Sequence, residues 1–522
     1  MTDVIVVGAG SAGAAVAGRL TEDPDISVLL LEAGPSDRVK EVAIPAAFSK
    51  LFRTERDWAY ETEPQAELDG RRLFWPRGKM LGGSSSMNAM MWVRGVPEDY
   101  DAWAAAGAAG WAYEDVLPFF RRIENAQRTD GRHVGEGGPL PIEDQRDPNP
   151  TTSAFVEACV RAGFRRNPNA NAGDNEGVDF AQVTQRRGRR ASAAWAYLRP
   201  AMRRPNLEVV TDALVTRVVI ESGRAVGVRY RRNDTEHHAQ AREVVLSGGT
   251  VNSPQLLALS GIGPRGDLEA LGIEVVTDLP GVGRNLSDHL VAGFVVGTDR
   301  TDTLVSAESL GNLVRYLLAR RGPLTSNVGE AHAFFRSDPS LDAPDLELLF
   351  APVPFLDHGA TDPPGHGFTL GTILLQPRSR GTIRLRAADP SVPPAIDPAY
   401  LSDPEDLRIL VSGLRRAQEV LGTEPLAAMV AGPMRPEALP RTDADREAVV
   451  RRHAETLYHP VGTCAMGTGA DAVVDPELRV HGIEGLRVAD ASVMPTLNRG
   501  HTNAPAIMIG ERAADFVGSA LR

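Results

Sequence analysis

The N-terminal segment restricts the fold more than any other part of the chain. Residues 3–7 form an apolar, β-branched run that predicts a buried parallel strand, and residues 8–13 follow it as Gly-Ala-Gly-Ser-Ala-Gly. A small-residue helix from Ala14 to Leu20 and a second buried strand, residues 26–31, lead to Glu32. A lone GxGxxG is often a plain glycine-rich turn, but this order of strand, helix, strand and acid predicts a dinucleotide-binding unit.

The glycines of this unit have separate tasks in the predicted complex. Gly8 permits the tight turn, Gly10 lets the backbone approach a pyrophosphate, and Gly13 lets the helix pack against the strand. The helix begins with Ser11 and Ala12, so its unpaired N–H groups and partial positive charge face the anion. We therefore expect these five residues at the cofactor.

The acid at the end of the second strand indicates which dinucleotides fit. Glu32, followed by Ala33, can accept hydrogen bonds from both hydroxyls of a ribose, and its charge disfavours a 2′-phosphate. This argument does not separate NAD from FAD.

A second glycine-rich loop runs from Arg77 to Asn88 and contains Gly82, Gly83 and three serines. Its backbone and hydroxyl donors suit phosphates or the polar edge of a flavin ring, although a flexible surface loop is an equal alternative. The loop leads into residues 89–94, which are too apolar for a surface segment.

The later chain predicts a return to the first sheet and then a second domain. Residues 99–124 read as helical, residues 207–231 as an antiparallel ribbon, and residues 243–259 as a strand and helix of the parallel sheet. From about residue 290, strand-like runs alternate with long proline-rich loops, which are typical of the walls of a site. We expect a dinucleotide-binding region at 1–290, a substrate-binding domain at 291–450 and a C-terminal return at 451–522.

Composition excludes several classes of partner. The formal net charge of the 522-residue chain is −12, which argues against nucleic acid, and no apolar run reaches the 18 residues of a membrane span. Two cysteines make no disulfide framework, and the first strand begins at Asp3, so we expect a cytoplasmic protein without a signal peptide. No His, Cys or carboxylate cluster has metal-ligand spacing, and the loop residues His358 and His366 are expected to be solvated.

Five motifs in order resemble the glucose–methanol–choline (GMC) oxidoreductases, and their choline-dehydrogenase-like branch most closely. They are the N-terminal unit, residues 78–91, residues 249–263, residues 283–289 and the two histidine motifs near the C-terminus, and together they span almost the whole chain. The resemblance implies an α/β fold, in which a Rossmann-like FAD-binding domain is interleaved with an α+β substrate-binding domain on an antiparallel sheet.

The resemblance also implies that FAD is the dinucleotide and that it is not covalently bound. Some family members attach FAD through a histidine of the second glycine loop, but Met87 stands at the matching position, and a thioether cannot form that bond. The further FAD contacts expected on this basis are Gly82, Gly83, Asn88, Met91, Val215, Asp490, Ala491 and Asn503.

Two histidines are expected to carry the chemistry. His459, in His-Pro-Val-Gly-Thr, matches the family's active-site histidine, and His501 matches a second position that is His or Asn in the family. Oxidation of an alcohol needs a base for the hydroxyl proton while hydride leaves for flavin N5, and histidine suits that base. We assign the base to His459 and a supporting role to His501, although two close imidazoles titrate as a pair.

The substrate is a small-molecule alcohol that the sequence does not identify, and the electron acceptor is oxygen or another molecule. Two alternatives on the same fold are a hydroxynitrile lyase and a light-driven fatty acid decarboxylase, and a nicotinamide dehydrogenase is a weaker one. The oligomeric state stays open. One set of aromatic residues fits either an apolar pocket or the core: Phe334, Phe335, Phe350, Phe355 and Phe368.

Overall fold

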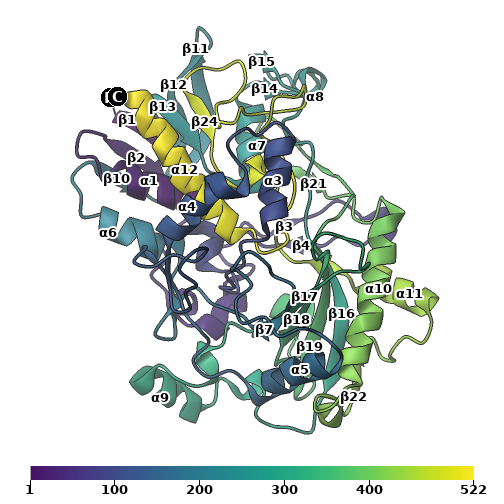
Figure 1. The fold of residues 1–522 in the computed structure, drawn as a ribbon. Helices are drawn as coiled ribbons and strands as arrows, with labels where there is room; N and C mark the ends of the chain where they lie inside the picture. Colours follow the sequence, from purple (N-terminus) through teal and green to yellow (C-terminus); the bar gives the residue numbers. More distant parts are fainter. Residues whose placement is uncertain (1) are drawn as a thin grey trace.

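A computed structural model describes residues 2–522 and contains two large sheets (Figure 1). The first has the order β10-β2-β1-β13, with β24 beside β13, and all of these pairings are parallel. Its strands are β1 (Thr2–Val7), β2 (Val28–Leu31), β10 (Leu207–Val210), β13 (Thr235–Leu246) and β24 (Leu486–Val488). The expected dinucleotide-binding unit therefore forms the centre of a parallel sheet.

The antiparallel ribbon expected at residues 207–231 is only partly correct. Strands β11 (Leu214–Glu221) and β12 (Arg224–Arg232) do pair antiparallel with each other and with the first half of β13. However, β10 is the parallel edge strand beside β2. Short buried strands of either kind have the same apolar pattern, so the sequence alone did not separate them.

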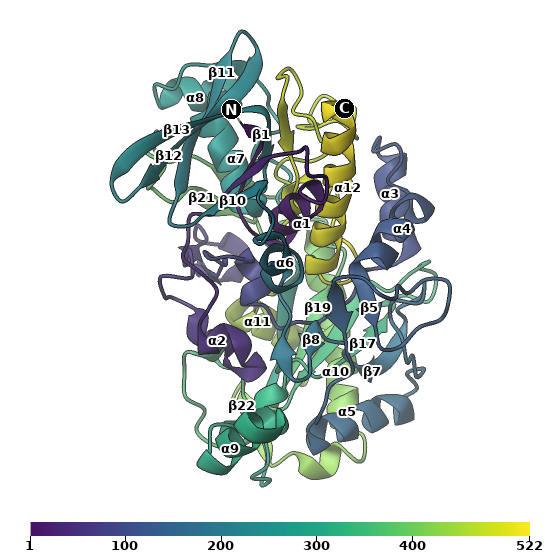
Figure 2. The same cartoon turned by 90° about the vertical axis from the view of Figure 1, so that its left-hand side faces the viewer.

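Helices α1 (Ser11–Leu20) and α12 (Asn503–Leu521) pack side by side against the parallel sheet (Figure 2). A Cβ at Gly510 of α12 would lie 2.4 Å from the Ala12 carbonyl oxygen, so only glycine permits this approach. The long helix after His501 is therefore fixed directly against the helix of the dinucleotide-binding unit.

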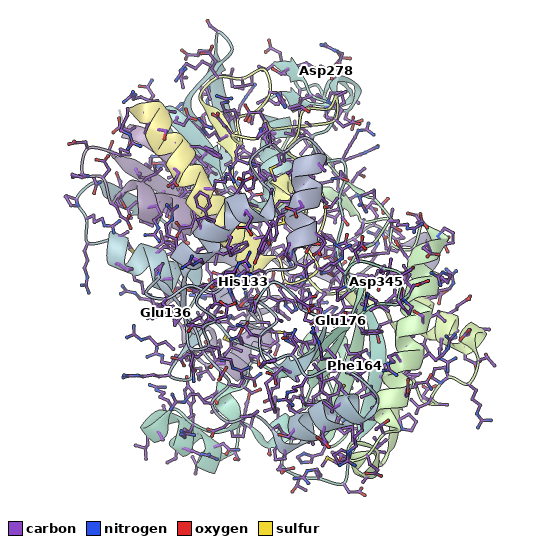
Figure 3. The ribbon with its side chains drawn as sticks, in the orientation of Figure 1. His133, Glu136, Phe164, Glu176, Asp278 and Asp345 are labelled. Atoms are coloured by element: carbon purple, nitrogen blue, oxygen red, sulfur yellow. The ribbon has the colours of Figure 1, made fainter. Side chains whose placement is uncertain are left out.

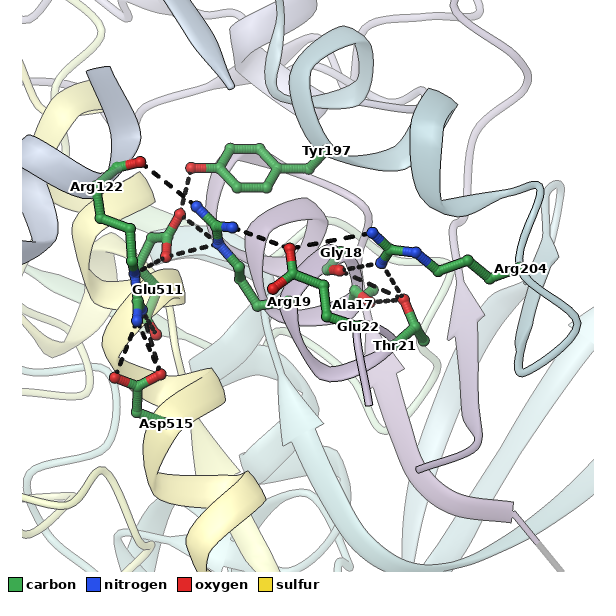
Figure 4. Close-up of polar contacts among 10 residues, drawn as sticks. All are labelled: Ala17, Gly18, Arg19, Thr21, Glu22, Arg122, Tyr197, Arg204, Glu511 and Asp515. Carbon is green, nitrogen blue, oxygen red and sulfur yellow. Dashed lines mark hydrogen bonds and ion pairs between the residues drawn. The ribbon is translucent and has the colours of Figure 1, made fainter. Parts of the chain in front are cut away.

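A buried carboxylate ties these helices together. Glu511 of α12 accepts hydrogen bonds from Arg19 Nε of α1 at 2.9 Å, from Arg122 Nε at 2.6 Å and from the Tyr197 hydroxyl at 2.6 Å (Figure 4). Removing such partners would leave an uncompensated buried charge, which is strongly destabilising. The network thus holds the middle of α12 against α1.

The second sheet is antiparallel throughout and has the order β17-β18-β19-β16-β22, with β23 beside β16. Helices α5 (Pro150–Arg161) and α10 (Pro404–Leu421) pack on it. The strands are β16 (Leu290–Gly297), β17 (Ala331–Phe335), β18 (Leu346–Ala351), β19 (Gly367–Leu374), β22 (Gly432–Arg435) and β23 (Glu455–Thr456).

Segments from both sides of residue 290 build the core of this sheet. Phe155 of α5 stacks on Phe350 of β18 with ring centroids 4.8 Å apart. Phe164, which is labelled in Figure 3, packs edge-on against Phe335 at 5.5 Å. The expected α/β fold, a Rossmann-like domain interleaved with a second domain on an antiparallel sheet, is confirmed. The proposed limits of the domains, 1–290, 291–450 and 451–522, stay predictions.

The helical segment expected at 99–124 is two helices, α3 (Pro97–Ala105) and α4 (Tyr113–Ile123). Gly107 and Gly110 between them have φ of +105° and +83°, which ends the first helix.

No helix among residues 2–522 is long and apolar enough to cross a membrane. The remaining elements are α2 (Lys40–Ala43), α6 (Arg199–Ala201), α7 (Gly249–Leu259), α8 (Arg265–Ala270), α9 (Leu310–Ala319), α11 (Asp443–His453), β3 (Tyr60–Glu61), β4 (Phe74–Trp75), β5 (Glu124–Ala126), β6 (Leu140–Ile142), β7 (Gly177–Phe180), β8 (Gln185–Arg186), β9 (Arg189–Arg190), β14 (Ile262–Gly263), β15 (Thr277–Asp278), β20 (Thr382–Arg384) and β21 (Ala395–Asp397).

Candidate active site

A cavity of about 440 Å³ begins at the carboxyl ends of the parallel strands, where Val7, Leu31 and Leu246 line it. It extends to the antiparallel sheet, where Val291 and Leu349 form part of its wall. Ligands of open α/β sheets bind beyond the carboxyl ends of the strands, so this is the expected place for a cofactor.

The structure brings most of the sequence-predicted residues to this one cavity. Those that line it are Gly8, Gly10, Ser11, Ala12, Glu32, Ala33, Gly83, Asn88, Met91, Val215, His459, Asp490, Ala491, His501 and Asn503. Gly13 and Gly82 are not in the lining. A Cβ at Gly13 would lie 2.0 Å from the Gly8 carbonyl oxygen, and Gly82 has φ of +87°, so both shape the backbone instead.

The two glycine loops interlock where α1 begins. The Gly82 N–H donates to the Ala9 carbonyl oxygen at 2.7 Å, and a Cβ at Gly83 would lie 2.8 Å from Gly10 Cα. Gly10 caps α1 without a side-chain hydrogen bond, so the first N–H groups of the helix stay available beside the cavity. Such a cradle fits the phosphates of a dinucleotide.

The start of α12 meets the start of α1 in the same cavity. The Ser11 hydroxyl donates to Asn503 Oδ1 at 2.7 Å, and Thr502 caps α12 without a side-chain hydrogen bond. Two helix N-termini therefore direct partial positive charge into one space.

Glu32 lies buried at the end of β2, next to the cavity. Its carboxylate accepts hydrogen bonds from the N–H groups of Ala9 and Gly34, both at 2.9 Å. Burial raises the pKa of Glu32 to about 7, although these hydrogen bonds act in the opposite direction. Each carboxylate oxygen retains a second acceptor site for a ribose hydroxyl.

His459 is held by a third histidine, His289, which the sequence analysis did not assign to the site. The Nδ1 atoms of the two rings lie 3.0 Å apart, and His289 Nε2 lies 3.0 Å from the Leu375 carbonyl oxygen. A carbonyl only accepts, so we assign a proton to His289 Nε2, which makes its Nδ1 the acceptor for His459 Nδ1–H. The lone pair of His459 is then on Nε2.

Burial keeps this pair uncharged. Burial lowers the pKa of His459 well below its usual range, and the neighbouring Arg77 guanidinium acts in the same direction. Burial also lowers the pKa of His289 to about 3. His459 is therefore neutral near pH 7 and can accept a proton at Nε2.

Asp288 fixes the backbone at the same point. Its carboxylate accepts from the His459 N–H at 2.7 Å and from the Thr456 hydroxyl at 2.6 Å, and it also contacts the Tyr400 hydroxyl. The motif at residues 283–289 thus supplies two consecutive side chains, Asp288 and His289, that position His459.

His501 lies on the other side of His459, with ring centroids 5.0 Å apart, and has a different partner. Its Nε2 lies 3.2 Å from Glu347 Oε1, and Glu347 is fully buried in β18. His332 Nδ1 is 3.8 Å from the same oxygen, but burial lowers the pKa of His332 to about 4, so this ring is uncharged near pH 7. His501 is then the side chain that hydrogen-bonds to Glu347.

Glu347 was not predicted, although the sequence contains a signal for it. Glu347 lies between Leu346 and Leu348 in β18, so it is the one charged residue in the otherwise apolar run Leu-Glu-Leu-Leu-Phe. A buried charge in a strand is rare unless it is paired. The sequence does not show that the partner is 154 residues away.

The wall opposite the glycine loops is largely aromatic and contains Phe48, Phe52, Phe355 and Tyr458. His358, expected to be solvated, also lines the cavity, and its Nδ1 lies 2.6 Å from the Tyr458 hydroxyl, so that expectation was wrong. Among the five phenylalanines in question, Phe355 reaches the cavity, whereas the core contains Phe334, Phe350 and Phe368.

Comparisons with known proteins agree with this architecture. The family model described as GMC oxidoreductase matches residues 2–291 and 377–510. The alcohol dehydrogenase [acceptor] of Pseudomonas putida is 43% identical, with 99% of this chain and 96% of that protein covered. The mitochondrial choline dehydrogenase of Homo sapiens is also 43% identical, over 98% and 89%.

A solved structure of an Aspergillus oryzae formate oxidase variant superposes with a TM-score of 0.92 at 29% identity, over 99% of this chain and 98% of the other. The expected resemblance to choline-dehydrogenase-like proteins is confirmed by these relatives. The chain belongs to the GMC oxidoreductase family.

Proposed function

We propose that the protein is an FAD-dependent enzyme that oxidises an alcohol to an aldehyde or ketone and passes the electrons to oxygen or another acceptor. The observation that carries this proposal is the neutral His459 ring, which lines the cavity. Its Nδ1 contacts His289, so its Nε2 keeps the lone pair that can accept a proton. The alcohol dehydrogenase of Pseudomonas putida supports the oxidation of an alcohol, and the formate oxidase, whose FAD is described as modified, supports the cofactor.

The glycine cradle suits FAD. Gly10, Ser11 and Ala12 would face the pyrophosphate, Glu32 the ribose, and Val215 the adenine. FAD, when bound, supplies the acceptor for the hydride that leaves the alcohol carbon. The helix N-termini favour negative charge in this space.

We also propose that FAD is held without a covalent bond, because Met87, with its inert thioether, lines the cavity where some relatives have a histidine. Acid precipitation should release all of the flavin into the supernatant. Flavin that stays with the precipitated chain would contradict this part of the proposal.

The side chains divide the proton chemistry between them. His459 Nε2 takes the hydroxyl proton, and the resulting imidazolium keeps donating from Nδ1 to His289. We assign to His501, whose Nε2 contacts Glu347 Oε1, the role of hydrogen-bonding the developing alkoxide. Two histidines in unequal environments thereby gain opposite roles.

The decisive experiment is anaerobic mixing of the purified yellow enzyme with a panel of primary and secondary alcohols. An alcohol substrate should bleach the flavin, and admission of air then shows whether oxygen restores the colour. Cleavage of a hydroxynitrile without bleaching, or turnover of a fatty acid only under blue light, would replace this proposal with one of the alternatives. A colourless purified protein would favour a nicotinamide cofactor.

A further inference from the structure

Helix α9 (Leu310–Ala319) exposes an apolar stripe to solvent. The side chains at positions i, i+3, i+4, i+7 and i+8 of an amphipathic helix form one face, and that face normally turns toward a core. Here the same spacing is exposed: Leu310 is 77% exposed, Leu313 38%, Val314 46%, Leu317 58% and Leu318 84%.

The orientation of α9 is fixed by its opposite face. Tyr316 is buried in a small cluster with Ala307 and Leu324, against the partly buried Ile44 and Ala46. The helix lies at the end of the molecule opposite both termini in two perpendicular views (Figures 1 and 2). The apolar stripe therefore points away from the protein.

Basic side chains border the stripe. Arg315, Arg320 and Arg321 are on or just after α9, and the hairpin β8–β9, with Arg187 and Arg189, packs against its end. A Cβ at Gly188 of this hairpin would lie 2.8 Å from the Arg320 carbonyl oxygen. Three acidic side chains contact this region. Asp147 lies 3.0 Å from Arg321 and 3.7 Å from Arg315, Glu308 contacts Lys50, and Glu143 accepts a hydrogen bond from the Arg187 N–H at 2.9 Å. The patch is thus net positive, although the whole chain carries −12.

We propose that α9 binds an anionic lipid surface and lies in its interface, with the apolar stripe among the acyl chains and the arginines at the headgroups. Apolar residues on one side and arginines at the edge are the composition of such interfacial helices. A ten-residue helix is about 15 Å long and lies on a bilayer rather than crossing it.

Charge favours lipid over a second copy of this chain as the occupant. Packing α9 against the α9 of another copy would bring two basic borders together, and like charges at an interface are unfavourable. An anionic surface neutralises the same border. Binding would also place the neighbouring segment 45–51, which carries Phe48 to the cavity wall, next to the lipid.

Vesicle flotation with the FAD-loaded enzyme tests this proposal without any substrate, so its result is independent of the proposed function. We expect binding to phosphatidylcholine vesicles that contain phosphatidylglycerol, weaker binding to phosphatidylcholine alone, and loss of the difference at high salt. Leu318→Glu should weaken binding about tenfold or more. The matched control is Val276→Glu, at a residue that is 41% exposed and precedes β15, whose Asp278 lies at the opposite end of the molecule (Figure 3).

A second variant keeps the test valid if Leu318→Glu does not fold. Arg321→Gln should lower binding to the phosphatidylglycerol vesicles about fivefold and leave binding to phosphatidylcholine unchanged. Absence of vesicle binding by the wild type, or equal binding by both α9 variants and the wild type, would overturn the proposal. A dimer in light scattering that Leu318→Glu dissociates, without vesicle binding, would assign the helix to a second copy of the chain.

Discussion

The Nδ1 atoms of His289 and His459 lie 3.0 Å apart, and the far nitrogen of His289 is bound to the Leu375 carbonyl oxygen. This chain of contacts determines which nitrogen of His459 can act as a base. In a hydrolytic triad, a carboxylate orients the catalytic histidine in the same way. Here the orienting group is a neutral imidazole ring.

Replacement of the base is the first test. His459→Ala should retain the yellow flavin, because the phosphate cradle is built by other elements, but turnover should fall about 10²- to 10⁴-fold. Flavin absorbance per chain and steady-state turnover measure the two effects. Full activity in this variant would remove His459 from the mechanism.

Replacement of the orienting ring is more specific. His289→Ala removes the acceptor for the His459 Nδ1 proton, so the base samples the wrong tautomer, and kcat should fall about 10²-fold or more with a small change in KM. A merely structural effect would instead reduce flavin content and thermal stability in parallel with kcat. His289→Asn, whose amide oxygen can accept the same proton, should recover part of the rate.

Glu347→Gln tests the pairing with His501. The amide keeps the size of the side chain but loses the negative charge beside His501 Nε2. Because this contact orients the His501 ring, kcat should fall about tenfold while the flavin content stays unchanged. The control is the same substitution in a His501→Asn background, where it should have little further effect; equal effects in both backgrounds would show that Glu347 acts elsewhere.

Because burial lowers the pKa of His459, the enzyme should stay active at more acid pH. The base works only when neutral, and a depressed pKa keeps it neutral to more acid pH. The acid limb of kcat/KM should accordingly lie below pH 6.5, the ordinary value for histidine. An acid limb above pH 7 would contradict a buried neutral base.

The same burial predicts how stability depends on pH. The pKa of His289 is about 3 in the folded protein and about 6.5 when exposed, so its contribution is present above pH 6.5 and is lost progressively as pH falls toward 3. Between pH 7 and pH 5 this single group accounts for about 2 kcal/mol. Thermal midpoints should fall over that range in the wild type and fall less in His289→Asn.

Local sequence determined the dinucleotide-binding unit and the identity of the main histidines. The turn at Gly8, the helix start at Ser11 and the acid at Glu32 lie within 25 residues, so backbone sterics and strand periodicity specify them without distant contacts. The histidines His459 and His501 were found because each lies in a recognisable motif. The parallel pairing of β10 was missed, since a short apolar strand does not encode its neighbour.

Tertiary structure alone decided how those histidines differ. His289 meets His459 from 170 residues away, and Glu347 meets His501 from 154 residues away. Neither contact can be recognised from a periodic pattern or a fixed residue spacing in the sequence, because both depend on how the antiparallel sheet lies against the end of the parallel sheet. The sequence by itself predicted which side chains carry the proposed chemistry, and the folded protein shows that His459 is buried against His289 whereas His501 contacts Glu347.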